Sequence, residues 1–406
     1  DGLRAELIGR QDEMTILQTM LAHVRSQGRG RLAAIVAPAG VGKSRLVAEL
    51  KRQPEAEAFL WLEGRSQPLT ASTGYWIFTD ILHDYLSRDA SEEALAQALV
   101  GLLHRLRQGG FLSEVDEDEL GLLLGQLLSL RLESARANRL DNMAAQQVRR
   151  RTLIALKRFF HALAEEQPLV LICEDLHWAD PLSLDLIGAL METLTSLPLL
   201  LLAIYRPEET QADGQLIALA RRRCPDSFVE LTLNALDENE SRQLVASLLA
   251  VDALPSSMRC LITDKAQGNP LYLEEVVRTL IEGDVLYRDG SRWRARKSLA
   301  SVAVPASLQS IVLSRVDRLA QAEKVYLQAA AVLGRLFRPR LVAAMLDSGV
   351  EAEFTLTTLI QESLVHQERA QPEPEYSFHH VLVRDAIYQD LPRGYRVDFH
   401  RRAAMA

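Results

Sequence analysis

Short, almost uninterrupted apolar runs recur in the first half of the chain and alternate with helix-like segments. A short run that stays apolar at successive positions is typical of a strand buried on both faces of a parallel sheet. The candidate strands are residues 31–37, 59–63, 169–173, 199–204 and 228–233, the last being the weakest. Helix-like residues follow at 44–51 and 181–196. This alternation predicts an α/β fold with a parallel sheet whose faces are covered by helices.

Outside these runs, the spacing of leucines indicates helices. Leucines three and four residues apart predict mostly helical structure from about residue 76 to residue 166. The acidic stretch Glu114–Glu119 within it is expected to be a solvated loop or helix face rather than a binding site. From Leu236 onward helices dominate. Leu364–Gln367 and Tyr376–His379 flank a polar, proline-bearing turn and so predict a β-hairpin.

The segment Ala37–Ser44 (APAGVGKS) lies between the first predicted strand and the helix after it. Glycines let backbone N–H groups surround phosphate oxygens, and the helix N-terminus adds partial positive charge. Lys43 would reach the β- and γ-phosphates, and the Ser44 hydroxyl would bind Mg²⁺. The usual pattern begins with glycine, and Ala37 can replace it where the backbone does not need a positive φ. We therefore expect a site for ATP or ADP with Mg²⁺, with the candidate contacts Pro38, Ala39, Gly40, Val41, Gly42, Lys43, Ser44 and Arg45.

Three charged residues follow two other predicted strands. Glu174 and Asp175 end the strand at 169–173, where one carboxylate can join the Mg²⁺ shell and the next can orient or deprotonate water. We assign the metal role to Glu174 and the catalytic base role to Asp175; with Ser44, both acids are candidate Mg²⁺ ligands. Arg206 follows the strand at 199–204 and is a candidate sensor of the γ-phosphate. The alternative for Arg206 is a surface arginine held by a carboxylate.

Composition and charge narrow the class of protein. A chain of 406 residues predicts two to four domains, and its net charge of −8 argues against a major DNA-binding surface. The three cysteines match neither a metal-ligand spacing nor a disulfide framework, which fits a reducing cytoplasm. No apolar run is long enough for a membrane span. Because the chain begins at Asp1 and stops within an apparently helical stretch, we expect it to be part of a longer protein.

With these elements in order, the chain resembles the STAND class of signalling P-loop ATPases. It is most similar to the ATPase modules of large LuxR-type transcriptional regulators and of multidomain bacterial adenylate cyclases and kinases, over essentially its whole length. The stretch His177–Asp180 (HWAD) after the paired acids is highly specific for this group. The motifs that carry the resemblance are LIGR at 7–10 with Glu13, APAGVGKSRL at 37–46, EDLHWADPLSLDLI at 174–187, AIYRPEE at 203–209, GNPLYLEEVVRTL at 268–280, VPASLQSIVLSRVDRL at 304–319 and FHHVLVRDAIY at 378–388.

The resemblance implies further nucleotide contacts. The segment Ile8, Gly9 and Arg10 would lie against the adenine and ribose, and Pro270 would pack on the base. His380 would reach the β-phosphate in a closed, ADP-bound state, although the adjacent His379 leaves the choice between the two open. Arg206 matches the sensor arginine. Without the resemblance, residues 8–10 would simply begin the first domain, Pro270 would start a helix and His380 would be a packed histidine.

The implied architecture is a P-loop ATPase domain, a small helical domain and a winged helix. The predicted limits are 1–235 (with a helical insertion at about 76–166), 236–300 and 301–395, followed by the start of a helical, repeat-like segment at 396–406. The winged helix is not expected to bind DNA directly, because its candidate third helix, Phe354–Ser363, carries Glu362 and no arginine or lysine. Arg288–Lys297, with Trp293 inside it, is the one candidate patch for an anionic partner, and a solvated hairpin is the favoured interpretation.

The leading functional hypothesis is a cytoplasmic nucleotide switch. ADP would hold the later domains closed on the ATPase domain, exchange for ATP would allow self-association or regulation of a fused or partner effector domain, and hydrolysis would be slow. The first alternative is an AAA-type machine that acts on nucleic acid or protein. The second is a scaffold that binds nucleotide permanently. A metabolic kinase is less favoured, because no acceptor-substrate pocket is evident from the sequence.

Overall fold

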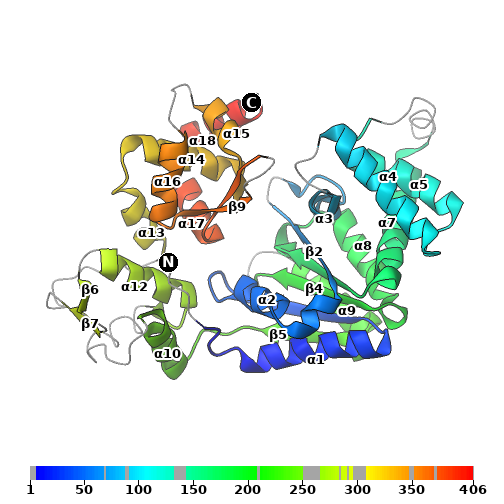
Figure 1. Ribbon diagram of the computed structural model, residues 1–406, viewed down its shortest axis with the longest axis horizontal. Helices are drawn as coiled ribbons and strands as arrows, with labels where there is room; N and C mark the ends of the chain where they lie inside the picture. Colours follow the sequence, from blue (N-terminus) through cyan, green and yellow to red (C-terminus); the bar gives the residue numbers. More distant parts are fainter. Residues whose placement is uncertain are drawn as a thin grey trace. The chain divides into compact units, whose positions relative to one another are not determined.

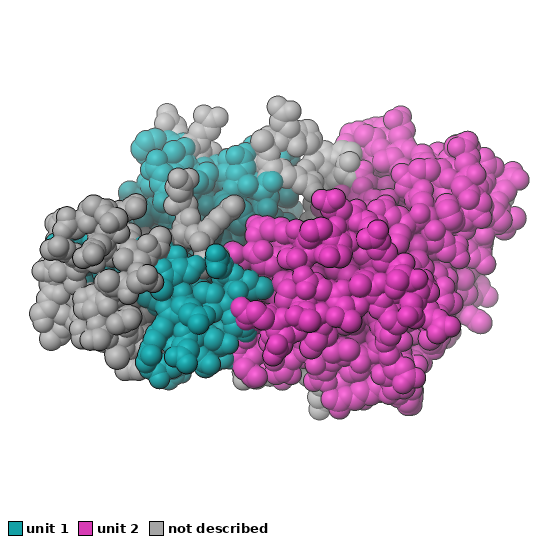
Figure 2. Space-filling model, turned by 60° about the horizontal axis from the view of Figure 1, so that its bottom comes forward, with its two compact units in different colours: residues 1–9, 39–41, 235–406 teal, residues 10–38, 42–234 magenta. Residues whose placement is uncertain are grey.

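The computed structural model describes most of the chain and divides it into two compact units (Figure 2). Unit 1 comprises residues 1–9, 39–41 and 235–406, and unit 2 comprises residues 10–38 and 42–234. The described residues are 6–67, 70–86, 91–131, 143–207, 211–249, 266–282, 285–289, 292–295, 308–346, 352–369 and 373–405.

A five-stranded sheet forms the centre of unit 2 (Figure 1). Its strands are β1 (Arg31–Val36), β2 (Leu60–Arg65), β3 (Leu169–Glu174), β4 (Leu199–Tyr205) and β5 (Phe228–Thr232). Their order is β2-β3-β4-β1-β5, and every neighbouring pair is parallel. The predicted parallel α/β fold is confirmed, including the weak fifth strand.

Helices surround this sheet. Every residue of β3 and β4 is buried, which requires cover on both faces. The helices of unit 2 are α1 (Gln11–Gln27), α2 (Lys43–Lys51), α3 (Trp76–Leu86), α4 (Glu92–Gln108), α5 (Glu114–Leu127), α7 (Ala145–Glu166), α8 (Pro181–Met191) and α9 (Gln211–Arg223). Short 3₁₀ turns are η1 (Pro54–Ala58), η3 (Leu176–Trp178), η4 (Leu194–Ser196) and η5 (Pro225–Ser227).

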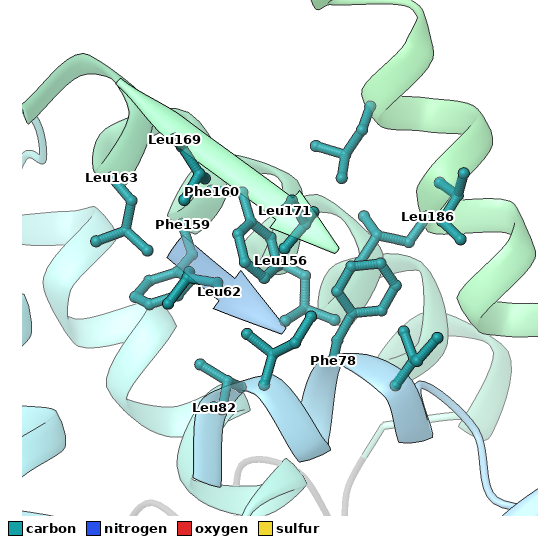
Figure 3. Packing of buried hydrophobic residues seen from close by; sticks show 14 of the residues in the cluster. Leu62, Phe78, Leu82, Leu156, Phe159, Phe160, Leu163, Leu169, Leu171 and Leu186 are labelled. Carbon is teal, nitrogen blue, oxygen red and sulfur yellow. The ribbon is translucent and has the colours of Figure 1, made fainter. Parts of the chain in front are cut away.

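One large apolar core joins the sheet to α3, α7 and α8 (Figure 3). Leu169 and Leu171 of β3 belong to it, whereas the intervening Val170 is buried outside it, as expected because successive side chains point to opposite faces of a strand. Phe160 of α7 lies 5.4 Å, between ring centroids, from Phe78 of α3. The helical stretch predicted at 76–166 therefore contributes to the core of the sheet.

The acidic stretch Glu114–Glu119 forms the first turns of α5. Ser113 and Asp116 make a capping box, in which each side chain binds the other residue's backbone N–H. Acidic residues are favoured there because the helix N-terminus carries partial positive charge. The expected helix face is confirmed, and the acids have a structural role.

Unit 1 begins with helices and a small hairpin. These are α10 (Glu238–Leu249), α12 (Pro270–Glu282), the antiparallel pair β6 (Leu286–Asp289) and β7 (Arg292–Ala295), and α13 (Leu308–Val316). Leu244, Leu273 and Ile311 belong to one buried cluster of α10, α12 and α13. The basic segment Arg288–Lys297 lies partly in the hairpin, as predicted, and Lys297 falls outside the described residues.

The rest of unit 1 has the element order helix, strand, helix, helix, strand, strand. These elements are α14 (Gln321–Leu333), β8 (Leu336–Phe337), α15 (Pro339–Met345), α16 (Ala352–Gln361), β9 (Val365–Arg369) and β10 (Glu375–Phe378). The strands form an antiparallel sheet in the order β8-β10-β9, so the predicted hairpin is confirmed. This order is consistent with a winged helix, an assignment that stays a prediction.

Two final helices complete unit 1, α17 (Val381–Asp390) and α18 (Arg393–Ala403). Phe399 of α18 is buried in the same cluster as Val383 of α17 and Val342 of α15. The helical segment predicted from residue 396 thus begins at Arg393 and packs into the preceding core. Among the described residues, no helix has the length and apolar character that crossing a membrane would require.

Candidate nucleotide-binding site

The loop between β1 and α2 adopts the backbone that its glycines permit. Gly40 has φ of 82° and Gly42 has φ of 105°, a region that residues with a side chain rarely adopt. A Cβ at Gly42 would meet nothing within 4 Å, so its requirement is conformational. Ala37, where the usual motif has glycine, is not among the residues with positive φ. Alanine is therefore compatible with this position, as predicted.

The N-terminus of α2 has the features of an anion-binding site. The helix begins at Lys43, no side chain caps its N-terminus, and its first turn carries no acidic residue. The first N–H groups of a helix lack partners within the helix, and the helix dipole favours negative charge near them. Lys43 donates from Nζ to the carbonyls of Ala37 at 2.5 Å and Pro38 at 3.0 Å, so its ammonium lies against the loop. Ser44 is exposed, and Arg45 forms an ion pair with Glu49 at 2.8 Å.

The tip of the loop, residues 39–41, belongs to unit 1 together with α12. The Asn269 side-chain amide donates to the carbonyl of Ala39 at 3.1 Å, and the Leu271 N–H donates to the carbonyl of Gly40 at 3.3 Å. A Cβ at Gly40 would lie 2.8 Å from the Asn269 amide. Within this unit, the beginning of α12 therefore holds the backbone of the loop tip.

The two acids at the end of β3, Glu174 and Asp175, differ in their surroundings. Glu174 is buried and accepts hydrogen bonds from Nε of Arg65 at 2.7 Å and from Nη2 of the same guanidinium. Asp175 has φ of 54°, which turns the chain away from the strand. Burial and the negative charge of Glu174 raise the pKa of Asp175, against the opposing positive charges of Arg65, Arg206 and Lys43.

Arg206 follows β4 and is half-buried. Its charge acts on Asp175, as does that of Lys43, so unit 2 brings these three predicted site residues within electrostatic range of one another. Arg65 is a residue that the sequence reasoning missed. The available signal was its place at the end of a predicted strand, but no local pattern pairs residues 109 positions apart.

The stretch His177–Asp180 has a structural explanation. Asp180 caps α8 by accepting from Ser183 N at 2.9 Å, and it also accepts from the backbone N–H groups of Tyr75 at 2.9 Å and Trp76 at 3.1 Å. His177 is buried beside Trp178. Asp180 thereby ties the start of α8 to the start of α3. An aspartate before a proline that starts a helix was a recognisable capping signal.

The predicted contacts at the N-terminus divide between the two units. In unit 1, Ile8 packs against the α10–α12 cluster, and Gly9 (φ 67°) lies so close to Glu240 that a Cβ would come within 2.5 Å of its carboxyl group. In unit 2, Arg10 is buried and donates to the carbonyl of Asn234 at 2.5 Å. Arg10 also lies 3.7 Å from Glu13.

Pro270 and His380 both belong to unit 1. Pro270 is the first residue of α12, and His380 precedes α17 with its Nε2 3.8 Å from Oε2 of Glu274, one turn along α12. Burial, the charge of His379 and that of Arg278 lower the pKa of His380 to about 3. Burial, followed by the charge of Arg278, lowers the pKa of His379 to about 4. His380 contacts Glu274 of α12, and His379 interacts electrostatically with Arg278 of the same helix. Which of the two histidines would touch nucleotide stays a prediction.

These residues fit a nucleotide with a magnesium ion. The uncapped start of α2, the positive φ of Gly42 and the Lys43 ammonium suit phosphate. The Ser44 hydroxyl and the two carboxylates are oxygen donors, which Mg²⁺ prefers, usually with phosphate oxygens and water completing its shell. Among the described residues, no group of three or more acidic, histidine or cysteine side chains could hold a metal ion.

Residues 6–202 match the family model of the AAA ATPase domain. This segment is similar to AAA ATPase domains. The prediction of a P-loop ATPase is thereby confirmed for it. Residues 237–286 match a family of domains of unknown function. An uncharacterized protein of Rhizobium meliloti is 28% identical over 409 residues, which cover 98% of this chain and 36% of that protein. The chain thus spans about a third of the curated relative that it matches.

Several solved structures are similar to this chain at low sequence identity. A STAND protein with a tetratricopeptide repeat sensor from Pyrococcus horikoshii has a TM-score of 0.48 at 12% identity, covering 100% of this chain and 46% of that one. The ORC1 protein of Aeropyrum pernix, solved with DNA, has a TM-score of 0.41 at 14% identity, covering 97% and 96% of the two chains. Cdc6p of Pyrobaculum aerophilum has a TM-score of 0.41 at 12% identity, covering 99% and 96%.

Proposed function

We propose that the chain is an ATP/ADP-dependent signalling switch of the STAND class. It binds Mg²⁺ with the nucleotide, hydrolyses ATP slowly and couples the nucleotide state to the opening of its later domains. The observation that carries this proposal is the pair of hydrogen bonds from Asn269 and Leu271 to the carbonyls of Ala39 and Gly40. The tip of a phosphate-binding loop is held by the helix that carries Pro270.

Coupling between the nucleotide and domain opening depends on differential affinity. A ligand shifts a conformational equilibrium only to the extent that it binds the two states differently. A loop backbone that rearranges around phosphates changes its hydrogen bonds to Asn269 and Leu271, so nucleotide state and the position of α12 become linked. Shifting the chain from a mostly closed to a mostly open state requires a difference of roughly 5 kcal/mol between the binding free energies for the two states. His380 precedes α17 and lies beside Glu274 of α12. It would add a contact that is specific to ADP.

The proposed hydrolysis uses residues of unit 2. Lys43 and the start of α2 hold the phosphates, and Ser44 and Glu174 hold the metal. Asp175 orients and deprotonates the attacking water, and Arg206 stabilises the charge that develops in the transition state. Bound Mg²⁺ would supply charge neutralisation at the phosphate oxygens. The burial that raises the pKa of Asp175 makes it a stronger base than a solvated aspartate. Ile8, Gly9 and Arg10 complete the proposed nucleotide contacts on the adenine side.

The domain limits form part of the proposal. The ATPase domain spans 1–235, the small helical domain 236–300 and the winged helix 301–395, followed by helical structure. The winged helix would contact protein rather than DNA, so the output belongs to self-association or to a fused or partner effector, as in transcription regulation. The buried free thiols Cys173 and Cys224 support placement in a reducing cytoplasm.

ADP release tests the switch. Asn269→Ala in the whole chain removes the hydrogen bond to Ala39, so a fluorescent ADP analogue should dissociate several-fold faster, in line with about 1 kcal/mol for a neutral hydrogen bond. Gln321→Ala, at the exposed first position of α14, is the control and should match the wild type. Equal release rates for wild type and Asn269→Ala would exclude coupling through α12.

The AAA ATPase match also favours a second candidate, a machine driven by ATP hydrolysis. Such a machine hydrolyses ATP rapidly when its polymer substrate is present. Adding DNA or an unfolded polypeptide to the ATPase assay separates the two: strong stimulation supports the machine, and a slow rate unaffected by either supports the switch. A permanently occupied scaffold would instead retain its nucleotide through prolonged exchange against excess ATP.

A further inference from the structure

Arg65 lies at the carboxyl end of β2, directly opposite Glu174 of β3. Two nitrogens of its guanidinium, Nε and Nη2, donate to the same oxygen of Glu174, Oε2. Nε also lies 3.8 Å from Oδ2 of Asp175, and Nη2 lies 3.4 Å from Oε1 of Glu63. One positive charge therefore lies next to both acids that the proposed function assigns to the metal and to water.

The position of Arg65 is fixed by its backbone. The Arg65 N–H donates to Oδ2 of Asp80 at 2.9 Å, and the next N–H, of Ser66, donates to the carbonyl of Glu174 at 3.0 Å. Gly64 allows α3 to approach the strand closely, since a Cβ there would lie 2.3 Å from the carbonyl of Ile77. These restraints keep the guanidinium beside Glu174.

Burial makes the ion pair strong. The side chains of Arg65 and Glu174 are 18% and 7% exposed, so water screens them little. An arginine guanidinium remains charged in proteins, so the positive charge stays next to Glu174, Asp175 and Glu63. A divalent cation that binds Glu174 must therefore share this carboxylate with a neighbouring fixed positive charge, and like charges repel.

We propose that Arg65 is a positioning residue that competes with the divalent cation for Glu174. The inference rests on the proposed function, which assigns Glu174 to the metal. In the absence of metal, Arg65 neutralises Glu174 and keeps it in place. With metal and nucleotide present, the charge of Arg65 weakens metal binding. The affinity of the chain for ADP therefore depends less on the metal ion than it would if the carboxylates had no positive charge beside them.

Manganese binding tests this competition without relying on turnover. Electron paramagnetic resonance reports free Mn²⁺ in a titration of the full chain at saturating ADP. Arg65→Gln should bind Mn²⁺ about tenfold more tightly than the wild type, because one charge next to the ligand is removed. Arg65→Lys keeps the charge and should stay close to the wild-type affinity. Arg52→Gln removes an arginine that is 56% exposed and should have no effect, which controls for net charge.

Thermal unfolding supplies a second readout. Without metal, Arg65→Gln removes the positive charge next to the buried Glu174 carboxylate and should melt at a lower temperature than the wild type. Mn²⁺ with ADP should then raise its melting temperature by more than it raises that of the wild type, since tighter binding to the folded state stabilises more. Should Arg65→Gln not fold, Arg65→Met, which keeps the aliphatic stem, replaces it in both assays.

The outcomes separate the inference from the proposed function. Unchanged or weaker Mn²⁺ binding in the neutral variants, with normal Mn²⁺·ADP binding in the wild type, overturns the competition and leaves the nucleotide site intact. An equal gain in Arg65→Lys also overturns it, because the effect would then come from packing. Absence of Mn²⁺·ADP binding in the wild type overturns both the proposed metal site and the role of Arg65.

Discussion

Arg315 of α13 and Glu275 of α12 form an ion pair that is almost completely excluded from solvent. Nη1 of Arg315 lies 2.6 Å from Oε2 of Glu275, and the two side chains are 2% and 1% exposed. The Arg315 guanidinium also donates to the carbonyl of Glu362, just past α16. The pair thus links the helix that carries Pro270 to the part of unit 1 with the small antiparallel sheet.

Breaking this pair should strongly destabilise unit 1. Glu275→Gln leaves the Arg315 charge buried without its carboxylate, at a cost of about 3–5 kcal/mol in unfolding free energy, measured by urea denaturation. Glu238→Gln, which removes one side of an exposed pair with Arg242, should cost less than about 1 kcal/mol. Comparable losses of unfolding free energy in the two variants would show that the buried ion pair stabilises the fold no more than an exposed one.

Lys43→Ala should weaken ATP binding by about 100-fold, because a charged hydrogen-bond donor to phosphate is worth about 1.5–3 kcal/mol. Titration calorimetry with Mg²⁺ present measures the change. Lys51→Ala, at the other end of α2, removes the same charge and should leave the affinity close to that of the wild type. Unchanged affinity in Lys43→Ala would remove the phosphate-loop assignment.

Asp175→Asn should retain ATP but lower its hydrolysis rate by at least about 100-fold, the usual effect of losing a general base. The folded state should be at least as stable as the wild type. A raised pKa means that folding disfavours the charged carboxylate at neutral pH, and a neutral amide relieves that cost. Asp12→Asn, exposed in the first turn of α1, is the control. Normal turnover in Asp175→Asn would exclude Asp175 as the base.

Acidification should destabilise unit 1 through His379 and His380. Their pKa values are lowered to about 4 and about 3, whereas an unfolded histidine titrates near pH 6.5. Between these values the unfolded chain binds more protons, so stability falls as the pH decreases below about 6.5. Glu274, 3.8 Å from His380, opposes this effect only in part, since the pKa stays low.

Melting temperatures of the wild type and of the double variant His379→Gln/His380→Gln, compared from pH 7.5 to 5, check this dependence. The wild-type curve should fall more steeply on acidification, by roughly 1–2 kcal/mol of unfolding free energy per histidine at pH 5. Parallel curves would show that neither histidine is responsible.

Local pattern was sufficient for much of the fold. Apolar runs located all five strands of the parallel sheet. The runs of β1, β3 and β4 were the clearest, because a strand buried on both faces is apolar at nearly every position. The glycines and Lys43 marked the loop between β1 and α2 as the candidate phosphate loop, and the positive φ of Gly40 and Gly42 agrees with that pattern, but phosphate binding stays a prediction. The hairpin of β9 and β10 was visible from its turn residues. Each of these features depends on residues close together along the chain.

Pairings between distant segments could not be predicted in the same way. The sequence marked Gly268 as part of a motif, but not the reason: a Cβ there would lie 2.1 Å from the carbonyl of Leu236. It marked Asp180 as specific to a family, whereas the structure shows it joining α8 to the start of α3. Contacts of this kind depend on strand order and helix packing, which no local periodicity encodes.

The residue pattern alone specified a parallel α/β domain with a candidate phosphate loop and two acids at the end of a buried strand. What surrounds those acids depends on how distant segments pack. Placing β2 beside β3 brought Arg65 to Glu174, and the folding of unit 1 brought Asn269 to Ala39. Each residue type follows directly from the sequence, whereas the electrostatics of a site depend on which distant charges the packing brings within a few ångströms.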